Sequence, residues 1–412
     1  MKQKKLKWLI VFEICLLAVL IGAVIFLSSR RDDSLKADPT APTDLTTAPA
    51  TTVTASPTTV PATETTAAPT TLPVTEPATE ETTVPEPVPE HYWLSFAGDC
   101  TLGTMYQVYS AASSFPGLVG EDYDYPFASV QEWFANDDFT MVNLEGPLTN
   151  EGTPAEKSYC FRGDPKLAAI LPAGSVEGVS LANNHSEDFG LIGYENTKAA
   201  LNDVGIAYAG NGETFMCETA RGLKVGVLCV AFYIDLDEMA EKIVSLKDRG
   251  AQLIIVSFHW GNEGYFSHTY DQSLYAYAAI DAGAHIVHGH HPHVLQPIEE
   301  YNGGIIYYSL GNFAFGGNDC PRDFDTALIS QEVIVDVDGT VSLGACNPIP
   351  CSISPVDHIN RFQPTPAEEG SERYNRVMEK LNGTYAGPDV APPDPTEETA
   401  DETTAATTET NE

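Results

Sequence analysis

Five short apolar segments, each ending in polar side chains, constrain the fold of this chain more than any other feature. They read YWLSFAGDC, FTMVNLEGP, VEGVSLANNHSEDFG, LIIVSFHWG and AHIVHGHHPH. Runs of this length rich in Val, Ile and Phe are typical of buried strands, and their alternation with helical patterns favours an α/β sandwich. Because α/β sheets gather their sites at the carboxyl ends of the strands, we expect the polar residues after these runs to lie together.

The clearest helix of this pattern spans residues 235–250. Asp235 can cap its start and Gly250 can end it. Its apolar side chains fall on one stripe, made of Leu236, Met239, Ile243 and Leu246. A buried strand follows directly and ends at His259.

The first 31 residues predict a membrane anchor. A lysine cluster precedes an apolar stretch from Trp8 to Leu27, which at ~1.5 Å per residue spans a ~30 Å hydrocarbon core. No A-x-A-like cleavage site closes it. Four lysines before the stretch outweigh Arg30 and Arg31 after it, so we expect a single-pass protein in the cell membrane, with a cytoplasmic N-terminus and an extracellular C-terminal domain. The alternative is a buried helix of a soluble protein.

Two low-complexity segments flank the remaining sequence. Residues 32–90 form a Thr/Pro/Ala-rich tract with almost no large apolar side chains, which predicts a disordered stalk. Residues 386–412 form an acidic tail that we also expect to be disordered. The folded domain is therefore expected at 91–385.

Charge excludes one class of partner. Residues 91–385 hold 39 acidic and 14 basic side chains, a net charge of −25. A polyphosphate backbone needs Lys and Arg for neutralisation, so we expect no nucleic acid partner. An acidic surface can attract divalent cations, or it can serve solubility alone.

The cysteines leave disulfide pairing open. Of eight, Cys15 lies in the apolar N-terminal stretch, and the other seven are an odd number, so at least one thiol stays unpaired. Cys346 and Cys351 are close enough in sequence to form a bridge. The chain has no C-x-x-C pair, which disfavours a thiolate zinc site.

The residues that follow the five runs form a mixed oxygen and nitrogen set. Each has an ordinary explanation when taken singly: an aspartate or glutamate in a turn, an asparagine at a helix start, a hydrogen-bonded core histidine. Together they match the ligands of a divalent metal such as Zn, Mn or Fe. The proposed ligands are Asp99, Glu145, Asn184, His259, His291 and His293.

The last run carries four of the ten histidines of the chain within six positions. In an extended segment residues i and i+2 point the same way, so we expect His291 and His293 to face one metal cluster. His290 is then expected to point elsewhere. His288 and His290 could support the ligands, or they could simply pack against neighbouring side chains.

Six ordered motifs resemble a known family. FAGDCTLG, VNLEGPLT, VSLANNHSEDFG, VSFHWGNEG, GAHIVHGHHPHVLQP and YYSLGNFAF look like those of the bacterial capsule synthesis protein CapA family, which is associated with poly-γ-glutamate synthesis. The resemblance covers roughly residues 92–318. That family is similar in turn to calcineurin-like metallophosphoesterases, which implies a β-sandwich flanked by helices with a two-metal site at the strand ends.

The resemblance also implies roles for single residues. Asp99 resembles the first-motif aspartate, and Glu145 stands where an acidic residue would bridge two metals. Asn184 resembles the asparagine ligand, and His185 beside it resembles a general acid or transition-state stabiliser. The implied imidazole ligands are His259 and His291 on one metal and His293 on the other.

The sequence departs from the pattern of these families at two positions. Cys100 and Thr101 follow Asp99 where metallophosphoesterases usually place a histidine two residues on, and Thr104 stands where the capsule family commonly has a basic residue. These departures weaken the inference to phosphoester hydrolysis more than the inference to metal binding.

Further residues have less specific patterns. We expect Asn183 to contact substrate, whereas Asn312 could contact substrate or hold its own loop by side-chain hydrogen bonds. Residues 327–346 alternate like a hairpin around an Asp-Gly pair and are expected to complete the sheet. Residues 368–381 predict a closing surface helix.

The favoured function is an exported, membrane-tethered, metal-dependent hydrolase or transferase. Its expected substrate is a cell-envelope polymer such as capsular poly-γ-glutamate, or the linkage of such a polymer, and its expected partners include other membrane components of capsule synthesis. The alternative is a non-catalytic accessory protein whose metal-bearing domain binds or guides an anionic polymer. A spacer with a vestigial site would bind no metal.

Overall fold

The computed structural model describes residues 87–391, which belong to one compact unit that begins at Thr82. The expected membrane anchor (1–31), nearly all of the expected stalk (32–90) and most of the acidic tail (386–412) lie outside the described residues. Within residues 87–391, no helix combines the length and the apolar character that a membrane span requires.

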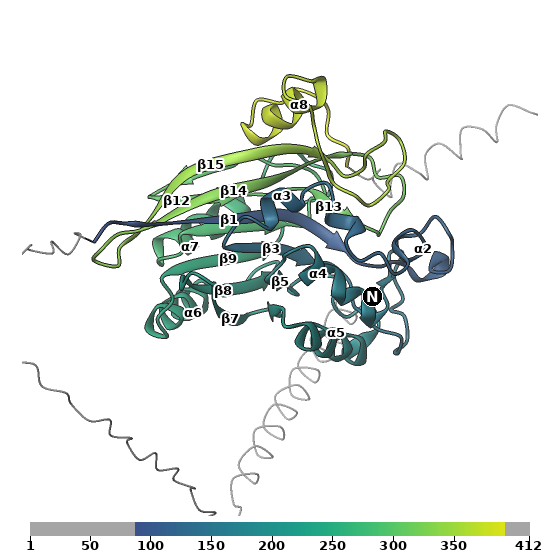
Figure 1. Ribbon diagram of the computed structural model, residues 1–412, viewed down its shortest axis with the longest axis horizontal. Coiled ribbons are helices and arrows are strands. Elements are labelled where there is room, and N and C mark those ends of the chain that lie inside the picture. The colour runs from purple at the N-terminus through teal and green to yellow at the C-terminus, as the bar shows by residue number, and fades with distance from the viewer. Residues whose placement is uncertain (1–86, 392–412) are drawn as a thin grey trace, which may run out of the picture. The chain divides into compact units, whose positions relative to one another are not determined.

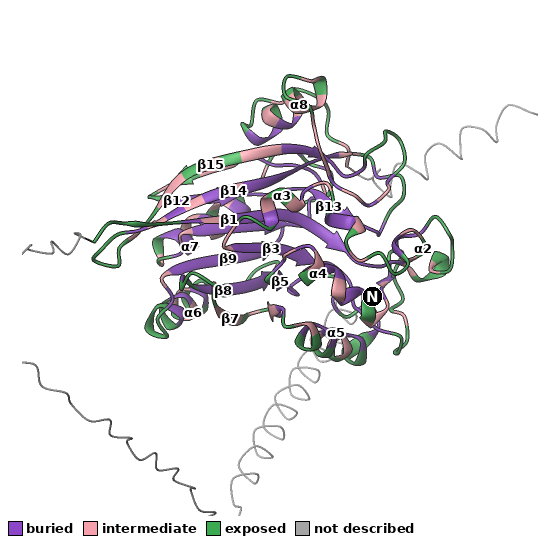
Figure 2. Ribbon diagram, viewed as in Figure 1, coloured by how far each residue is buried: buried purple, intermediate pink, exposed green. Residues whose placement is uncertain are grey.

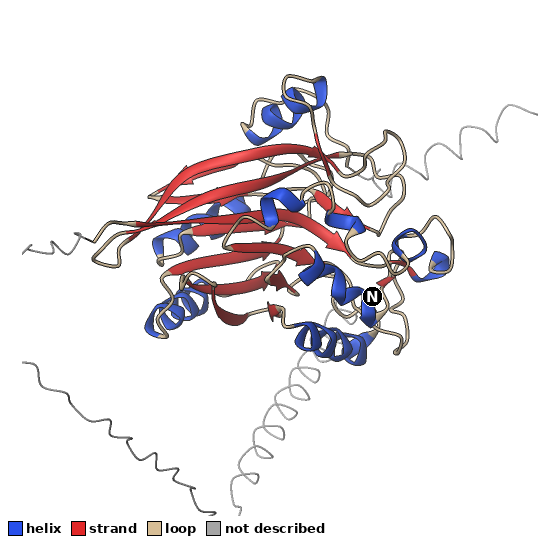
Figure 3. Cartoon of the chain, in the orientation of Figure 1, coloured by secondary structure: helices blue, strands red, loops and turns tan. Residues whose placement is uncertain are grey.

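Two β-sheets pack face to face between layers of helices, as the sequence led us to expect (Figures 1 and 3). The first sheet has the order β16-β15-β14-β1-β3-β5-β6, and β13 pairs in parallel with the end of β1. Neighbours from β1 to β6 run parallel, whereas β14, β15 and β16 are antiparallel to their neighbours. The strands are β1 (Glu90–Thr101), β3 (Phe139–Leu144), β5 (Gly178–Ser180), β6 (Ala207–Ala209), β13 (Asn312–Phe315), β14 (Asp325–Val335), β15 (Val341–Ser352) and β16 (Thr365–Pro366).

The second sheet has the order β11-β12-β10-β9-β8-β7. Its four inner strands are parallel, and β7 and β11 close the two edges in antiparallel pairs. The strands are β7 (Glu213–Glu218), β8 (Lys224–Ala231), β9 (Leu253–His259), β10 (Ile286–His290), β11 (Ile298–Tyr301) and β12 (Gly304–Tyr307). A separate two-stranded ribbon joins β2 (Thr104–Met105) to β4 (Phe161–Arg162).

Helices cover the outer faces of both sheets (Figure 3). Outside the first sheet lie α2 (Phe115–Val119), α3 (Gln131–Phe134), α4 (Ile170–Ala173) and α5 (Gly190–Val204), with the 3-10 turns η2 (Tyr106–Val108), η3 (Tyr125–Phe127) and η4 (Pro165–Ala169). Outside the second sheet lie α6 (Leu236–Asp248) and α7 (Tyr270–Asp281). The closing helix α8 (Glu372–Leu381) packs against β14 and β15.

The helix expected at 235–250 is confirmed as α6. The Asp235 side chain accepts hydrogen bonds from two backbone N–H groups of the first turn, and Gly250 follows the helix with a φ of 94°. Met239, Ile243 and Leu246 are buried, but Leu236, at the first position of the predicted stripe, is 36% exposed. A residue in the first turn of a helix can extend past the sheet that the later turns cover.

Strand alternation determines what reaches the gap between the sheets. In β9, Leu253 and Ile255 face the first sheet, and Ile254 faces α6 and α7. Because side chains alternate with a period of two, His259 lies on the inward face. In β3 the same rule puts Met141 and then Asn143 inward. Figure 2 shows these strands buried along their length. The polar strand ends therefore project into the space between two apolar layers.

The hairpin is confirmed, and the domain is slightly longer than expected. β14 and β15 pair around a turn in which Gly339 has a φ of 84°. β1 begins at Glu90, one residue before the expected boundary, and the backbone at Val390 bonds to Gly264 beyond the expected end. Composition could not reveal these contacts, because main-chain hydrogen bonds need no particular side chain.

The possible bridge between Cys346 and Cys351 does not form. All seven cysteines of the described part of the chain are free. Both residues lie on β15, opposite Gln331 and Thr326 of β14. Five positions along one strand separate their Cα atoms by ~16 Å at ~3.3 Å per residue, well beyond the reach of a disulfide.

Candidate metal centre

Four strands deliver polar side chains to one end of the gap between the sheets. The register pairs Asp99 of β1 with Asn143 of β3, and His259 of β9 with His290 of β10. Glu145 comes directly after β3, two positions beyond Asn143 on the same face. All five side chains are at most 1% exposed. The packing of the two sheets thus brings carboxylates and imidazoles together in a buried space.

Glu145 lies at the centre of this group. Its Oε1 is 3.7 Å from His293 Nε2, 3.9 Å from His185 Nε2 and 4.0 Å from His259 Nε2. That oxygen has no hydrogen-bond partner among residues 87–391. A buried carboxylate oxygen without a partner is costly, so this position fits a cation better than it fits an empty core.

Asn184, His259 and His291 form one side of the group. The Oδ1 atom of Asn184 lies 2.8 Å from His259 Nε2, and the rings of His259 and His291 lie 4.6 Å apart. His291 Nδ1 is buried and lacks a partner within the part of the chain that the structure describes. The residues predicted from separate segments of the sequence therefore do meet.

The donor set fits divalent metals. Asp99, Glu145 and His259 each offer one ligand atom, and these atoms lie within 4.8 Å of one another. Glu263, His291 and His293 make a second such group, on the side that faces solvent. Ligand bonds of ~2.0–2.3 Å let atoms that share one ion lie up to ~4.5 Å apart. Mixed carboxylate, amide and imidazole ligands suit Zn, Mn or Fe, so the residues present fit one or two such ions.

The two carboxylates have opposite pKa shifts. Burial acts to raise the pKa of Asp99, but the adjacent imidazoles of His290 and His293 outweigh it and hold that pKa well below its usual value. Burial raises the pKa of Glu145 well above its usual value, because the charge of His293 does not compensate for it. Glu145 is therefore the group whose ionisation would gain most from a bound cation.

The pKa values of the imidazoles are also shifted in different directions. Burial holds the pKa of His259 well below its usual value and, with the charge of His293, lowers the pKa of His291 to about 4. Both rings are thus neutral near pH 7, as a metal ligand must be. Burial also lowers the pKa of His293, but the Glu145 and Asp99 carboxylates overcome this and raise it to about 10.

His185 faces the centre from the first sheet. Its Nδ1 lies 2.9 Å from Asp188 Oδ2 and 3.1 Å from Lys157 Nζ, and its ring stacks on Phe161 at 4.3 Å. Asp188 thus orients the ring so that Nε2 points toward Glu145. Burial lowers the pKa of His185, despite the hydrogen bond to Asp188, so the ring is neutral near pH 7. Sequence reasoning missed Asp188 and Lys157, although the spacing of three residues from His185 to Asp188 was a signal for the former.

Asn183 makes its hydrogen bonds within the protein. Its amide group donates to Asn143 Oδ1 at 3.1 Å and to the Leu144 carbonyl at 2.9 Å, and its oxygen accepts from the His185 backbone. These bonds hold the loop, and the expected contact of Asn183 with substrate stays a prediction. Asn143 in turn donates to Asp99 Oδ1 at 2.9 Å.

The histidine turn also differs from expectation. β10 ends at His290, and His291 and His293 have φ values of 97° and 56°, so the segment is not extended. The side chains of His291 and His293 still reach the centre, but the turn places them there and not the alternation of an extended strand. His290 does not point elsewhere: its Nδ1 lies 3.2 Å from Asp99 Oδ1. The alternation of Ile286, His288 and His290 on β10 could have shown this.

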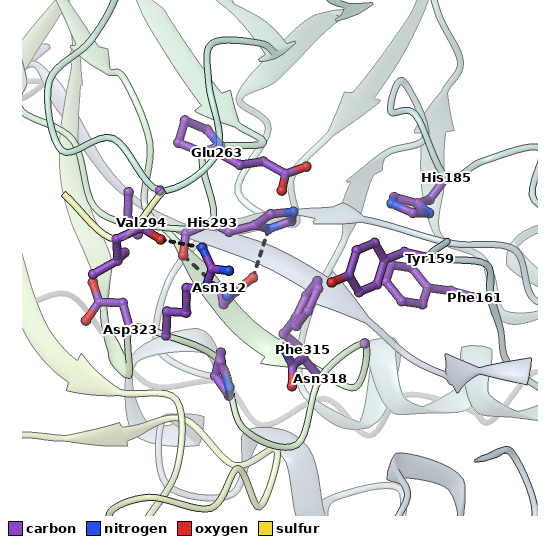
Figure 4. A pocket seen from close by; sticks show the side chains of 16 residues that line it. Tyr159, Phe161, His185, Glu263, His293, Val294, Asn312, Phe315, Asn318 and Asp323 are labelled. Atoms are coloured by element: carbon purple, nitrogen blue, oxygen red, sulfur yellow. Dashed lines mark hydrogen bonds between the residues drawn. The ribbon is translucent and has the colours of Figure 1, made fainter. Parts of the chain in front are cut away.

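A cavity of about 180 Å³ opens beside the centre (Figure 4). Tyr159, Phe161 and His185 lie on one side of it, and Glu263 and His293 lie on the other. Arg322 and Asn312 also line the cavity. Asn312 Oδ1 lies 3.0 Å from His293 Nδ1, so Asn312 holds a proposed ligand and borders the cavity at the same time. Sequence reasoning missed Glu263, which lies on a loop without periodicity.

The fold and the site define an α/β sandwich protein with a candidate divalent-metal centre at the joined ends of two sheets. Residues 93–317 match the family model of the bacterial capsule synthesis protein PGA_cap, over more than half of the chain. The chain therefore belongs to this family, the CapA family, as the six motifs indicated.

Individual relatives support this family assignment. The chain is 31% identical over 239 residues to the capsule biosynthesis protein CapA of Bacillus anthracis, covering 51% of this chain and 58% of that protein. It is 26% identical over 311 residues to the PGA biosynthesis protein CapA of Bacillus subtilis strain 168, covering 70% and 77%. A probable polyglutamine synthesis accessory protein of Mycobacterium tuberculosis is 30% identical over 209 residues, covering 42% and 55%. The match thus spans less than two thirds of the first and third of these relatives.

Among solved structures, NAD nucleotidase of Haemophilus influenzae superposes with a TM-score of 0.36 at 11% identity, covering 77% of this chain and 60% of that one. A superposition this weak says nothing about the chemistry of the site.

Proposed function

We propose that the chain is a metal-dependent hydrolase or transferase of envelope polymer biosynthesis, with a fold related to the metallophosphoesterases. The observation that carries the proposal is the unpartnered Oε1 of Glu145, surrounded by three imidazole nitrogens within 4.0 Å. The names of its relatives refer to capsule, PGA and polyglutamine synthesis, so the expected substrate is such a polymer or its linkage.

A divalent ion held by Asp99, Glu145, Asn184 and the imidazoles would supply Lewis-acid chemistry at a phosphoryl or acyl oxygen. The chain's own residues do the remaining work. His185, oriented by Asp188, presents Nε2 to the centre, where it can take up a proton and return it to a leaving group.

Lys157 also supports this geometry. It binds the Asn184 carbonyl at 2.9 Å and forms an ion pair with Asp188. It thereby ties the His185 loop to the segment that forms the aromatic side of the cavity.

The test uses the purified full chain, freed of metal and reloaded with Mn or Zn, against phosphodiester and γ-glutamyl substrates. Turnover that depends on the metal and falls at least ~100-fold in His185→Ala supports the enzyme. His285→Ala is the matched control, because His285 lies at the opposite end of β10, where it accepts a hydrogen bond from Ile254. Turnover that survives removal of the metal would contradict the proposal.

A second candidate is a non-catalytic accessory role. Two observations favour it: Thr101 and Thr104 replace a ligand and a basic residue, and the name of the M. tuberculosis relative contains the words accessory protein. In that role the domain binds an anionic polymer through its metal and shows no turnover. Sedimentation of the chain with poly-γ-glutamate, with and without metal, separates the two candidates.

We also propose that the chain is exported and anchored by residues 8–27, facing the envelope. The lysines before that stretch and its apolar length support this placement. Protease added to intact cells should remove the domain, whereas protection from protease would contradict the topology.

A further inference from the structure

His290 is a buried histidine whose function is not explained by the ligand set above. It is 1% exposed, and neither of its ring nitrogens has a hydrogen-bond partner among the described residues. A neutral imidazole carries one N–H donor and one acceptor, so both groups were desolvated without compensation. A residue in this state needs an explanation.

The surroundings of His290 leave one strong contact. Its Nδ1 lies 3.2 Å from Asp99 Oδ1, yet this contact lacks the direction of a hydrogen bond. If His290 were the protonated half of an ion pair, an N–H would point at the carboxylate. Two atoms bound to one ion by ~2.1 Å bonds at ~90–110° lie ~3.0–3.4 Å apart, which this distance matches.

Its neighbour on the same strand face shows the contrast. His288 packs edge-on against Phe96 at 5.1 Å and bonds the Ala97 carbonyl through Nε2 at 3.0 Å, so it is anchored in the core. His293 reaches the same aspartate from the other side, with Nδ1 3.2 Å from Asp99 Oδ2. Asp99 therefore lies between two imidazoles.

We propose that His290 is a metal ligand that shares an ion with Asp99. It supplies an imidazole where the sequence has Thr101, whose buried Oγ1 also lacks a partner in the described part of the chain. The inference rests on the proposed metal centre and adds a ligand to it. The ligand is a divalent cation of the Zn, Mn or Fe class.

The first test counts imidazole ligands in the full chain. With ¹⁵N-labelled histidine and ¹¹³Cd as the bound metal, each coordinated ring shows a nitrogen–cadmium coupling in the NMR spectrum. We expect coupling for His290 in addition to His259, His291 and His293, assigned by loss of one signal in each His→Gln variant. A loaded parent chain with three coupled rings in place of four overturns the inference, and this count does not depend on the folding of any variant.

The second test measures affinity. Metal-free His290→Gln should bind one ion at least ~100-fold more weakly than the parent by calorimetry, since even outer partners of ligands contribute ~10–100-fold. His285→Gln is the matched control, because His285 directly precedes β10 at the end away from the centre, and it should bind metal as the parent does. Unchanged affinity in His290→Gln refutes the ligand role. If the parent chain binds no metal at all, the proposed function fails first, so the two failures are distinguishable.

Discussion

The two sheets contribute different chemistry to the centre. The first sheet and its loops supply oxygen atoms, from Asp99, Glu145 and Asn184. The second sheet supplies imidazole nitrogens, from the ends of β9 and β10 and the turn that follows. Neither half contains a complete ligand set. The site therefore exists only where the sheets pack together, and a bound ion would link them.

We call the side chains from the first sheet the oxygen half and those from the second sheet the nitrogen half. The two halves are held in place differently. On the oxygen half, Asp99 is fixed by hydrogen bonds from Asn143 and from the His291 backbone, whereas Glu145 Oε1 has no partner among the described residues. On the nitrogen half, His290 and His291 have unpartnered ring atoms, and the backbone has positive φ at His291 and His293. Backbone strain of this kind costs ~1–3 kcal/mol per residue and persists only where the surroundings hold it.

Glu145→Gln should give the largest effect, because Glu145 is the one carboxylate within 4.0 Å of imidazoles from both halves. We expect metal affinity to fall by more than ~100-fold. The metal-free variant should be at least as stable as the parent, because burial raises the pKa of Glu145 and a neutral amide removes the cost of burying the ionised carboxylate.

Calorimetric titration and thermal unfolding in chelator check both statements. Reduced stability of the metal-free variant would show that Glu145 stabilises the fold by itself. Glu300→Gln on β11 serves as the control, because that residue is exposed and lies on an edge strand.

Removal of the metal should weaken the link between the sheets. At a free metal concentration of 100 Kd, binding stabilises the folded state by ~2.7 kcal/mol. For a domain of this size, that corresponds to a rise of a few degrees in Tm. Scanning calorimetry with and without chelator measures it, and an equal rise in Glu145→Gln would show that the ion binds elsewhere.

The sequence predicted the sandwich and the meeting of the six proposed ligands because both follow from strand alternation and from the polar ends of the runs. It failed where position depends on a turn. His291 and His293 reach the centre through positive φ values, which no periodicity reveals. Glu263 comes from an irregular loop, and the internal bonding of Asn183 depends on Asn143 of a neighbouring strand. When contacts between distant loops determine the position of a side chain, the sequence around that residue carries no local pattern that predicts it.

Acid should destabilise the nitrogen half in the metal-free protein. The pKa of His291 falls from 6.5 to about 4 on folding, so the unfolded chain binds the proton more tightly. The stability that His291 contributes is complete above pH 6.5 and is lost as the pH falls through 4. At pH 5 the loss is roughly 2 kcal/mol.

Urea unfolding in chelator at pH 7.5 and pH 5 compares the parent with His291→Gln. We expect the parent to lose roughly 2 kcal/mol more than the variant between these two pH values. The difference between the proteins isolates His291 from other groups that titrate in this range. Equal losses would mean that this ring does not titrate as its burial implies.

The smallest effect should come from Phe232, which borders the nitrogen half. Its ring packs edge-on against His259 at 6.2 Å and His291 at 5.5 Å, and its backbone has a φ of 62°. Its N–H bonds the His259 carbonyl at 2.7 Å, so the strained backbone and the ring both hold the imidazoles. Phe232→Ala loses the ring and keeps the strain, whereas Phe232→Gly loses both.

We expect metal affinity to fall several-fold in both variants, since both release the imidazoles. Metal-free Phe232→Gly should be more stable than Phe232→Ala by roughly 1 kcal/mol, because only glycine adopts a positive φ without strain. Thermal unfolding in chelator and calorimetric titration give the two readouts. Full metal affinity in Phe232→Gly would mean that backbone strain, and not the ring, controls the geometry of His259 and His291. The second sheet would then hold these two residues through its backbone alone.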